Sequence, residues 1–332
     1  MRCARATSLL VAAALTMSVG ACTSDRGDPE ASSADGPGPV LVPLDSTAWI
    51  DAVDRAESYD VIAGGPTDAR VVAAVVSHGE GPAGVRVWTA DEGEVAGSPV
   101  DVPGVIGDVT SVAADGTADL AALAGSVWSD GRTSSYLVTS RDRVAWDAVE
   151  LPPDVAQTRV TDVAVVDETT VVLTGAGVAG RQPTVSVLDT VTGEASTWAL
   201  PTSPDTDTTL TGVAAVGAQV LVTAAVGKRG EPASQVSFVS LDRGSTFDGP
   251  FPLAAAGATV SGVVRARSAW LATGGQRGTD GVQVPTAWSS TDGRTWQQDG
   301  ERVVTQEDGT TYAEGEDAAF GAPVVRAGQV GV

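Results

Sequence analysis

Short apolar segments alternate with glycine-rich connections along almost the whole chain. The segments are rich in Val, Thr and Ala; examples are Val171–Gly177 (VVLTGAG), Val220–Gly227 (VLVTAAVG) and Trp270–Gly275 (WLATGG). Residues of this kind in runs of this length favour buried strands bounded by loops. Apolar residues at helical spacing over a long window are hard to find after the N-terminus. The pattern therefore predicts an all-β protein.

A turn centred on aspartate recurs along the chain. The fullest copy is Ser240–Phe247 (SLDRGSTF), and Ser290–Trp296 (STDGRTW) is one residue shorter. Weaker copies are Ser140–Trp146, Thr89–Ala96, Leu188–Trp198 and Leu44–Trp49. The aspartates follow one another at intervals of 46, 51, 47, 53 and 50 residues and are Asp45, Asp91, Asp142, Asp189, Asp242 and Asp292. A steady period in this range predicts a stack or ring of equivalent units.

These turns resemble the Asp-box (bacterial neuraminidase) repeat, S-x-D-x-G-x-T-W, of sialidase-like β-propellers. The fullest copy matches it at Ser240, Asp242, Gly244 and Thr246, with Phe247 in place of Trp. We expect the carboxylate to accept backbone N–H groups of its own turn and the glycine to supply a positive φ. The aromatic side chain should fold back onto a neighbouring strand. In the family these turns are structural and lie away from the active face.

The repeat unit predicts four strands, and five units fit between about Tyr59 and Val304. A segment at each end of the chain remains, and the C-terminal Val324–Ala327 (VVRA) echoes Val263–Ala266. Residues 40–332 are therefore predicted to form a six-bladed β-propeller of four-stranded antiparallel blades, with one blade completed by both termini. The alternatives are a five- or seven-bladed propeller, or an incomplete one in which the chain stops inside a blade.

The N-terminus has the pattern of a bacterial lipoprotein signal. Arg2 and Arg5 precede an apolar stretch, and Val19–Cys22 (VGAC) resembles a lipobox. We expect residues 1–21 to be a signal peptide and Cys22 to carry the lipid, since two acyl chains suffice for stable anchoring. Residues 22–39, poor in large apolar side chains, would form a flexible tether. This predicts a lipid anchor at the extracytoplasmic face of the cell membrane. The alternative is ordinary secretion with an incidental cysteine.

Charge and composition narrow the partners. The chain carries 20 basic and 42 acidic residues, a net charge of −22. Such a balance disfavours nucleic acid and leaves the lipid as the only expected contact with the membrane. The single histidine, His78, lies in a glycine-rich segment, and with two cysteines in the whole chain we expect no metal and no cofactor.

Four arginines occupy equivalent positions in the predicted loops between second and third strands. Their spacings are 49, 48 and 48 residues, and they are Arg132, Arg181, Arg229 and Arg277. In a propeller these loops lie opposite the Asp turns, where guanidinium groups can hold a carboxylate, sulfate or phosphate. Tyr312, in the acidic segment Gln306–Asp317 expected on that face, joins them as a ligand-binding candidate. Alternatively, the arginines are ordinary loop residues neutralised by Asp205, Asp207 and that acidic segment.

The resemblance to sialidases does not extend to their catalytic residues. That family uses an arginine triad, a Tyr–Glu pair, an Asp acid and an F/Y-R-I-P motif, and the motif is absent here. A shared fold alone does not establish an activity. We expect a non-catalytic binding or scaffolding module for a protein, a glycan or another envelope component. The alternative is a sialidase-like or other glycoside hydrolase whose two carboxylates come from different blades.

Overall fold

The computed structural model describes residues 107–176, 182–200, 205–266, 268–278 and 281–301. It also describes the backbone of strands at 41–42, 56–62, 70–76, 84–90, 100–101, 324–326 and 329–331, together with the side chains of residues 84–87. Cys22, Asp45, Asp91, Arg181 and Tyr312 lie outside the described residues. Within the described part, no helix is long and apolar enough to cross a membrane.

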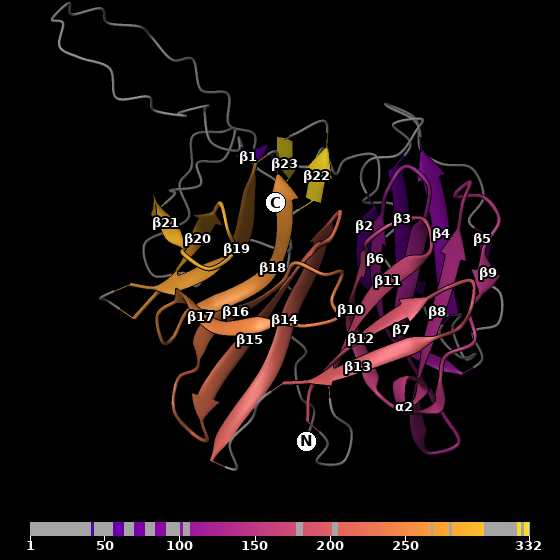
Figure 1. Ribbon diagram of the computed structural model, residues 1–332, viewed down its shortest axis with the longest axis horizontal. Coiled ribbons are helices and arrows are strands. Elements are labelled where there is room, and N and C mark those ends of the chain that lie inside the picture. The colour runs from indigo at the N-terminus through magenta and orange to yellow at the C-terminus, as the bar shows by residue number, and fades with distance from the viewer. Residues whose placement is uncertain are drawn as a thin grey trace, which may run out of the picture.

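The described residues form five four-stranded antiparallel sheets, each with its strands in sequence order (Figure 1). The first contains β2 (Ala56–Ile62), β3 (Arg70–Val76), β4 (Gly84–Ala90) and β5 (Val100–Asp101). The second contains β6 (Asp108–Gly116), β7 (Ala121–Ser129), β8 (Arg132–Ser140) and β9 (Asp147–Ala148). A short helix, α2 (Pro153–Ala156), leads to the third, which contains β10 (Arg159–Val165), β11 (Thr170–Ala176), β12 (Thr184–Asp189) and β13 (Ala195–Ala199).

The last two four-stranded sheets repeat this order. One contains β14 (Thr206–Val216), β15 (Gln219–Lys228), β16 (Ser234–Ser240) and β17 (Asp248–Ala254). The other contains β18 (Thr259–Ala266), β19 (Ala269–Arg277), β20 (Gln283–Ser290) and β21 (Gln297–Glu301). Each sheet is called a blade below and named by its first and last strands.

The blades have a propeller arrangement. The first strand of each blade lies against the first strand of the next, from β2 through β6, β10 and β14 to β18. The apolar core is divided among the gaps between blades: Val85 of β4 packs in one cluster with Leu123 of β7, and Val172 of β11 packs in another with Val222 of β15. Radial packing of small sheets lets a long chain bury its apolar residues without one large core.

The prediction of six four-stranded antiparallel blades is not confirmed. Four blades, β6–β9 to β18–β21, are described with their side chains, and β2–β5 is described by its backbone and by the side chains of residues 84–87. The terminal strands β1 (Leu41–Val42), β22 (Val324–Arg326) and β23 (Gln329–Gly331) form a sheet of only three strands beside β18 (Figure 1). In it β1 pairs with β23 in parallel, not antiparallel as predicted. These strands come from opposite ends of the chain and no hairpin turn joins them, so either direction of pairing is open to them.

A β-bulge recurs in the first strand of all five four-stranded blades, and the sequence pattern did not reveal it. In each blade the pairing of the first two strands shifts by one residue near the start of the first strand. The residues of the first strands that have no partner in this pairing are Glu57, Thr110, Thr161, Thr211 and Ser261. A bulge bends a strand and increases its twist, so its repetition gives successive blades the same curvature.

Candidate functional site

Because the strands of each blade are antiparallel, their connections lie on two opposite faces of the molecule. The loop face carries the connections between second and third strands and the starts of the first strands. Two hydrogen bonds show that these segments meet: Ser135 Oγ donates to the Thr158 carbonyl (2.6 Å), and the Arg229 N–H donates to the Asp205 carbonyl (3.2 Å). The Asp-turn face, at the opposite end, carries the turns between first and second and between third and fourth strands.

The four described aspartates of the repeat lie in the turns between third and fourth strands. Asp292 Oδ1 accepts the N–H groups of Arg294 and Thr295 (both 2.8 Å), and the Ser290 hydroxyl also donates to it (3.0 Å). Asp142, Asp189 and Asp242 make the corresponding bonds within their own turns. Hydrogen bonds from backbone N–H groups are the main reason that the pKa of each of these four carboxyl groups is lowered.

Each well-formed Asp turn also packs against the preceding blade. The Trp296 indole N–H donates to Ser237 Oγ of that blade (3.0 Å), and the Phe247 ring stacks on Trp198 with centroids 4.8 Å apart. Gly244 and Gly293 have φ of +86° and +71°. A Cβ at either glycine would lie 2.7 Å from an apolar side chain of the preceding blade. The turns therefore join neighbouring blades.

A hollow on the Asp-turn face lies where three blades meet. Its volume is about 440 Å³, and it is open to solvent. It is lined by residues of the β6–β7 turn, of the β10–β11 turn and of the Asp turn after β16, namely Thr117, Asp119, Val166, Asp167, Glu168, Thr169 and Arg243. The hollow thus contains three carboxylates and one guanidinium.

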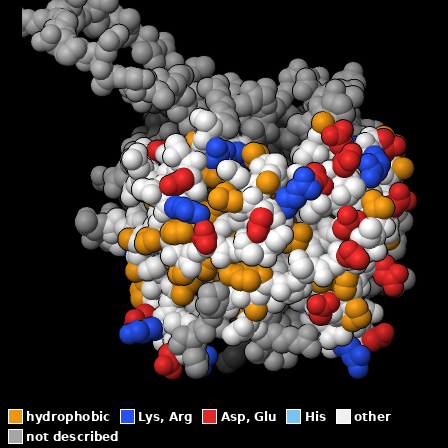
Figure 2. All heavy atoms as spheres, viewed as in Figure 1, with side chains coloured by type: hydrophobic (Ala, Val, Ile, Leu, Met, Phe, Trp, Pro, Cys, Tyr) orange, Lys and Arg blue, Asp and Glu red, His pale blue; other side chains and the backbone are white. Residues whose placement is uncertain are grey.

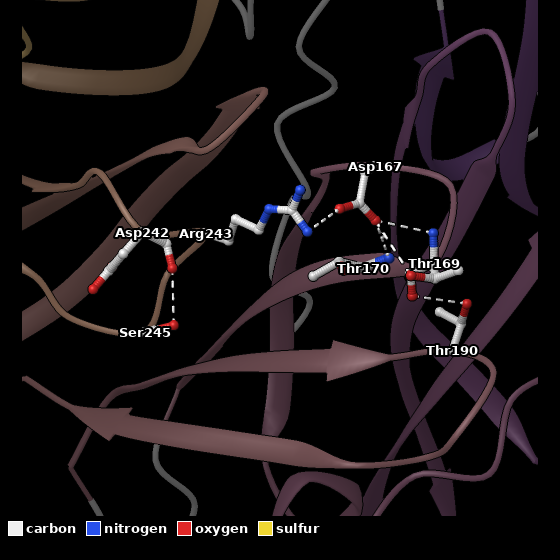
Figure 3. Close-up of polar contacts among 7 residues, drawn as sticks. All are labelled: Asp167, Thr169, Thr170, Thr190, Asp242, Arg243 and Ser245. Atoms are coloured by element: carbon white, nitrogen blue, oxygen red, sulfur yellow. Dashed lines mark hydrogen bonds and ion pairs between the residues drawn. The ribbon is translucent and has the colours of Figure 1, made fainter.

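An ion pair joins two of the blades at this hollow (Figure 3). Arg243 Nη1 lies 3.0 Å from Asp167 Oδ2, and Asp167 Oδ1 accepts the N–H groups of Thr169 (3.1 Å) and Thr170 (2.9 Å). Partial burial opposes ionisation of Asp167, but these hydrogen bonds and the Arg243 charge outweigh it and lower the pKa of the carboxyl group. Asp167 therefore stays ionised at neutral pH and is not suited to donate a proton. Its ion pair with Arg243 instead joins two blades.

The loop face contains three of the four predicted arginines. Arg132 and Arg277 are exposed at the ends of β8 and β19. Arg229 is exposed too, but its Nη2 lies 3.5 Å from Asp207 Oδ1, as expected if these arginines balance nearby acids. Within the described part of the chain, the ion pair of Arg229 is with Asp207 and not with a group shared by the other two arginines. On the face of the molecule shown in Figure 2, basic side chains lie singly among acidic ones.

Three side chains of interest were not predicted from the sequence. Asp167 and Arg243 are 76 positions apart and meet only because an Asp turn reaches over the neighbouring blade. Trp128 is exposed on the loop face although it follows an apolar segment. The Asp130–Gly131 pair, typical of a two-residue hairpin, was the available signal for the position of Trp128. No cluster of three or more potential metal ligands occurs in the part of the chain that is described.

Comparisons with known proteins give similarity to solved structures only. No family model matches the chain, and no curated protein does. A Hadza microbial sialidase has a TM-score of 0.49 and 15% identity, covering 72% of this chain and 51% of its own. A Trypanosoma rangeli sialidase (TM-score 0.42, 12% identity) covers 61% and 39%, and an exo-β-1,3-galactanase from Phanerochaete chrysosporium (0.44, 12%) covers 73% and 66%. This chain thus matches less than two thirds of each, and similarity at this level carries no argument about its activity.

Proposed function

We propose that this protein is a lipid-anchored, extracytoplasmic binding module that recognises a component of the cell envelope through its loop face. The observation that carries the proposal is the exposed indole of Trp128 on the loop face, which also carries two exposed arginines. On the Asp-turn face the repeated carboxylates are bonded to their own turns, and Asp167 is paired with Arg243. On the loop face Arg132, Arg277 and Trp128 are exposed to solvent. Exposed arginine and tryptophan are the residues that most often dominate binding energy.

The carboxyl chemistry of the described residues favours binding over hydrolysis. A glycosidase needs one carboxylic acid with a raised pKa to protonate the leaving group. Each described carboxyl group with a shifted pKa has it lowered. Burial raises the pKa of Tyr136, whose hydroxyl donates to the Ser111 carbonyl (3.1 Å), so this phenol is unsuited to act as a nucleophile. Glycoside hydrolysis is the alternative function, and it is tested by whether a bound saccharide is cleaved.

The proposal includes a closed ring of six blades. The pairing of Leu41 with Val330 supports it, because strands from both ends of the chain then share one sheet next to β18. Closure would cover the faces of the first and last blades that an open ring leaves exposed.

Anchoring through Cys22 rests on the Val19–Cys22 pattern and is tested by fractionation. The wild-type protein should sediment with membranes, and Cys22→Ser should release an unlipidated form or leave an unprocessed precursor. A Cys22→Ser protein that is processed and still membrane-bound would contradict the anchor.

Binding is tested with the full-length protein in detergent micelles on an array of immobilised glycans and purified envelope proteins. The Arg132→Ala/Arg277→Ala double variant should lose binding with little change in thermal stability, because exposed charges contribute little to folding. Arg141→Ala is the matched control, since Arg141 is an exposed arginine on the Asp-turn face. Unchanged binding by the double variant, or equal loss in the control, would contradict recognition through the loop face.

A further inference from the structure

Trp128 is the one exposed aromatic side chain among the residues whose side chains are described. It is 48% exposed, whereas the other tryptophans and phenylalanines of that set, and Tyr136, are buried or half-buried. Burial of an indole is strongly favourable, and tryptophan is among the residues that most often dominate binding energy at interfaces, so an exposed indole on a structured element is a candidate ligand contact.

A rigid hairpin holds this side chain in place. Trp128 lies near the end of β7, where it pairs with Thr133 of β8 on one side and with Asp108 of β6 on the other. The two-residue turn that follows has positive φ at both positions, +50° at Asp130 and +76° at Gly131. These angles belong to the tight hairpin turn that matches strand twist. The backbone that carries the indole is therefore fixed before any ligand arrives.

The register places the indole at the mouth of a gap between two blades. Ser126 Oγ donates to the Val160 carbonyl (3.3 Å) and Ser135 Oγ to the Thr158 carbonyl, so this side of blade β6–β9 faces blade β10–β13. Side chains alternate along a strand, which puts Trp128 on the side of Ser126 and Thr133 on the side of Ser135. Trp128 and Thr133 are thus neighbours on the side of the blade that faces β10–β13. They lie closer to the loop face than Ser126 and Ser135, which make the hydrogen bonds between the two blades.

The surroundings of Trp128 are polar. Asp108, Asp130 and Arg132 are exposed on the same hairpin or the adjoining strand. The other large exposed apolar side chains of the described residues belong to turns of the Asp-turn face and are Val144, Val191, Val216 and Leu241. A protein interface of ordinary size is built around an apolar core of several side chains, which the described loop face does not offer.

We propose that Trp128 is the stacking platform of a saccharide-binding subsite. A pyranose ring has a flat face of C–H groups and a rim of hydroxyls, and an indole bordered by hydrogen-bonding groups complements both. Asp108 and Thr133 pair with Trp128 across the strands and therefore lie on its side of the sheet. Asp108, with Asp130 in the turn, supplies acceptors for sugar hydroxyls, and the Thr133 hydroxyl can donate or accept. This inference rests on the proposed function and assigns its ligand to the saccharides.

The test uses the full-length protein in micelles and defined tetrasaccharides, with cello-, chito- and manno-oligosaccharides as the neutral arm and oligogalacturonate as the acidic arm. Binding is followed by calorimetry and by tryptophan fluorescence. Trp128→Ala should weaken binding by about tenfold or more, as expected for a dominant aromatic contact. Trp128→Phe, which keeps an aromatic face, should retain most of the affinity.

Val144→Ala is the matched control, because Val144 is an exposed apolar residue of the same blade at the opposite face. Saccharide binding that Trp128→Ala leaves unchanged would overturn the subsite while leaving the binding function intact. Capture of a protein that depends on Trp128, with none of the saccharides bound, would overturn the ligand class. Absence of any saccharide or protein ligand for the wild-type chain would contradict the proposed function itself.

Discussion

A single residue with positive φ shapes the Asp turn, and it need not be glycine. Ser140–Trp146 was a weak copy of the motif by sequence, yet it has the bonds of the best copies. The Arg143 N–H donates to Ser140 Oγ (2.7 Å), as the Gly293 N–H donates to Ser290 Oγ (2.8 Å). Arg143 adopts φ of +63° at this position, and its guanidinium donates to the Thr117 carbonyl (2.9 Å). The sequence predicted the turn but not that arginine could replace its glycine.

We expect Gly293→Ala to destabilise the protein more than Gly193→Ala. Both glycines have similar positive φ, +71° and +74°, so both variants incur about 1–2 kcal/mol of backbone strain. A Cβ at Gly293 would lie 2.7 Å from Leu221 and 3.0 Å from Val239, whereas none would meet an atom within 4 Å at Gly193. Overpacking should add about 1–3 kcal/mol at Gly293 alone. Denaturant unfolding measures both, and equal losses would refute the packing role.

The Asp turns after β16 and β20 also act as elements that join one blade to the preceding one. The sequence predicted this well in one respect: the aspartate period is the blade period, because each blade needs one such turn. The sequence did not predict the β-bulges at Thr110, Thr161 and Thr211, because a bulge depends on the register in which two strands pair. Trp128 was missed for a related reason. The seven residues of β7 before Trp128 are buried, and Trp128 is exposed because the strand extends beyond the neighbouring blade. The sequence does not show where that burial stops.

The Arg243–Asp167 pair should contribute modestly to the free energy of unfolding. Their side chains are 62% and 28% exposed, so we expect a coupling energy of about 0.5 kcal/mol in a double-mutant cycle. Asp167→Ala should cost about 1–2 kcal/mol by itself, because it also removes the acceptor of two backbone N–H groups. Strictly additive effects of the two alanine variants would mean that the contact does not couple the blades energetically.

Stability should fall as acid protonates the Asp turns. The folded-state pKa values of Asp142, Asp189, Asp242 and Asp292 are lowered by backbone hydrogen bonds, below the value of about 3.9 expected in the unfolded chain. Their contribution is therefore fully present above about pH 4–5 and is lost as the pH falls towards the folded-state pKa. The fourfold Asp→Asn variant should lose less stability than wild type between pH 5 and about 3 by denaturant unfolding. Asp147→Asn, an exposed carboxylate outside the turns, is the control, and parallel curves for all three proteins would contradict the prediction.

At the scale of the whole molecule, the two ends of the chain take part in the fold. The C-terminal hairpin of β22 and β23 pairs with β1 and lies against β18. Deletion of Gly321–Val332 should lower the melting temperature by several degrees, because it removes two strands of the terminal sheet and exposes the neighbouring blade. Deletion of residues 23–35 in the predicted tether is the control. A truncated protein that melts with wild type would favour an open ring.

At the scale of the whole molecule, Trp128 is exposed on the loop face, where we propose that the protein binds a ligand without changing it chemically. The most direct measurement incubates the full-length protein with a saccharide that it binds and follows the sugar by mass spectrometry. We expect saturable binding and recovery of the saccharide at its original mass, however long the incubation. Accumulation of cleaved sugar in molar excess over the protein would contradict it and identify the chain as a glycoside hydrolase.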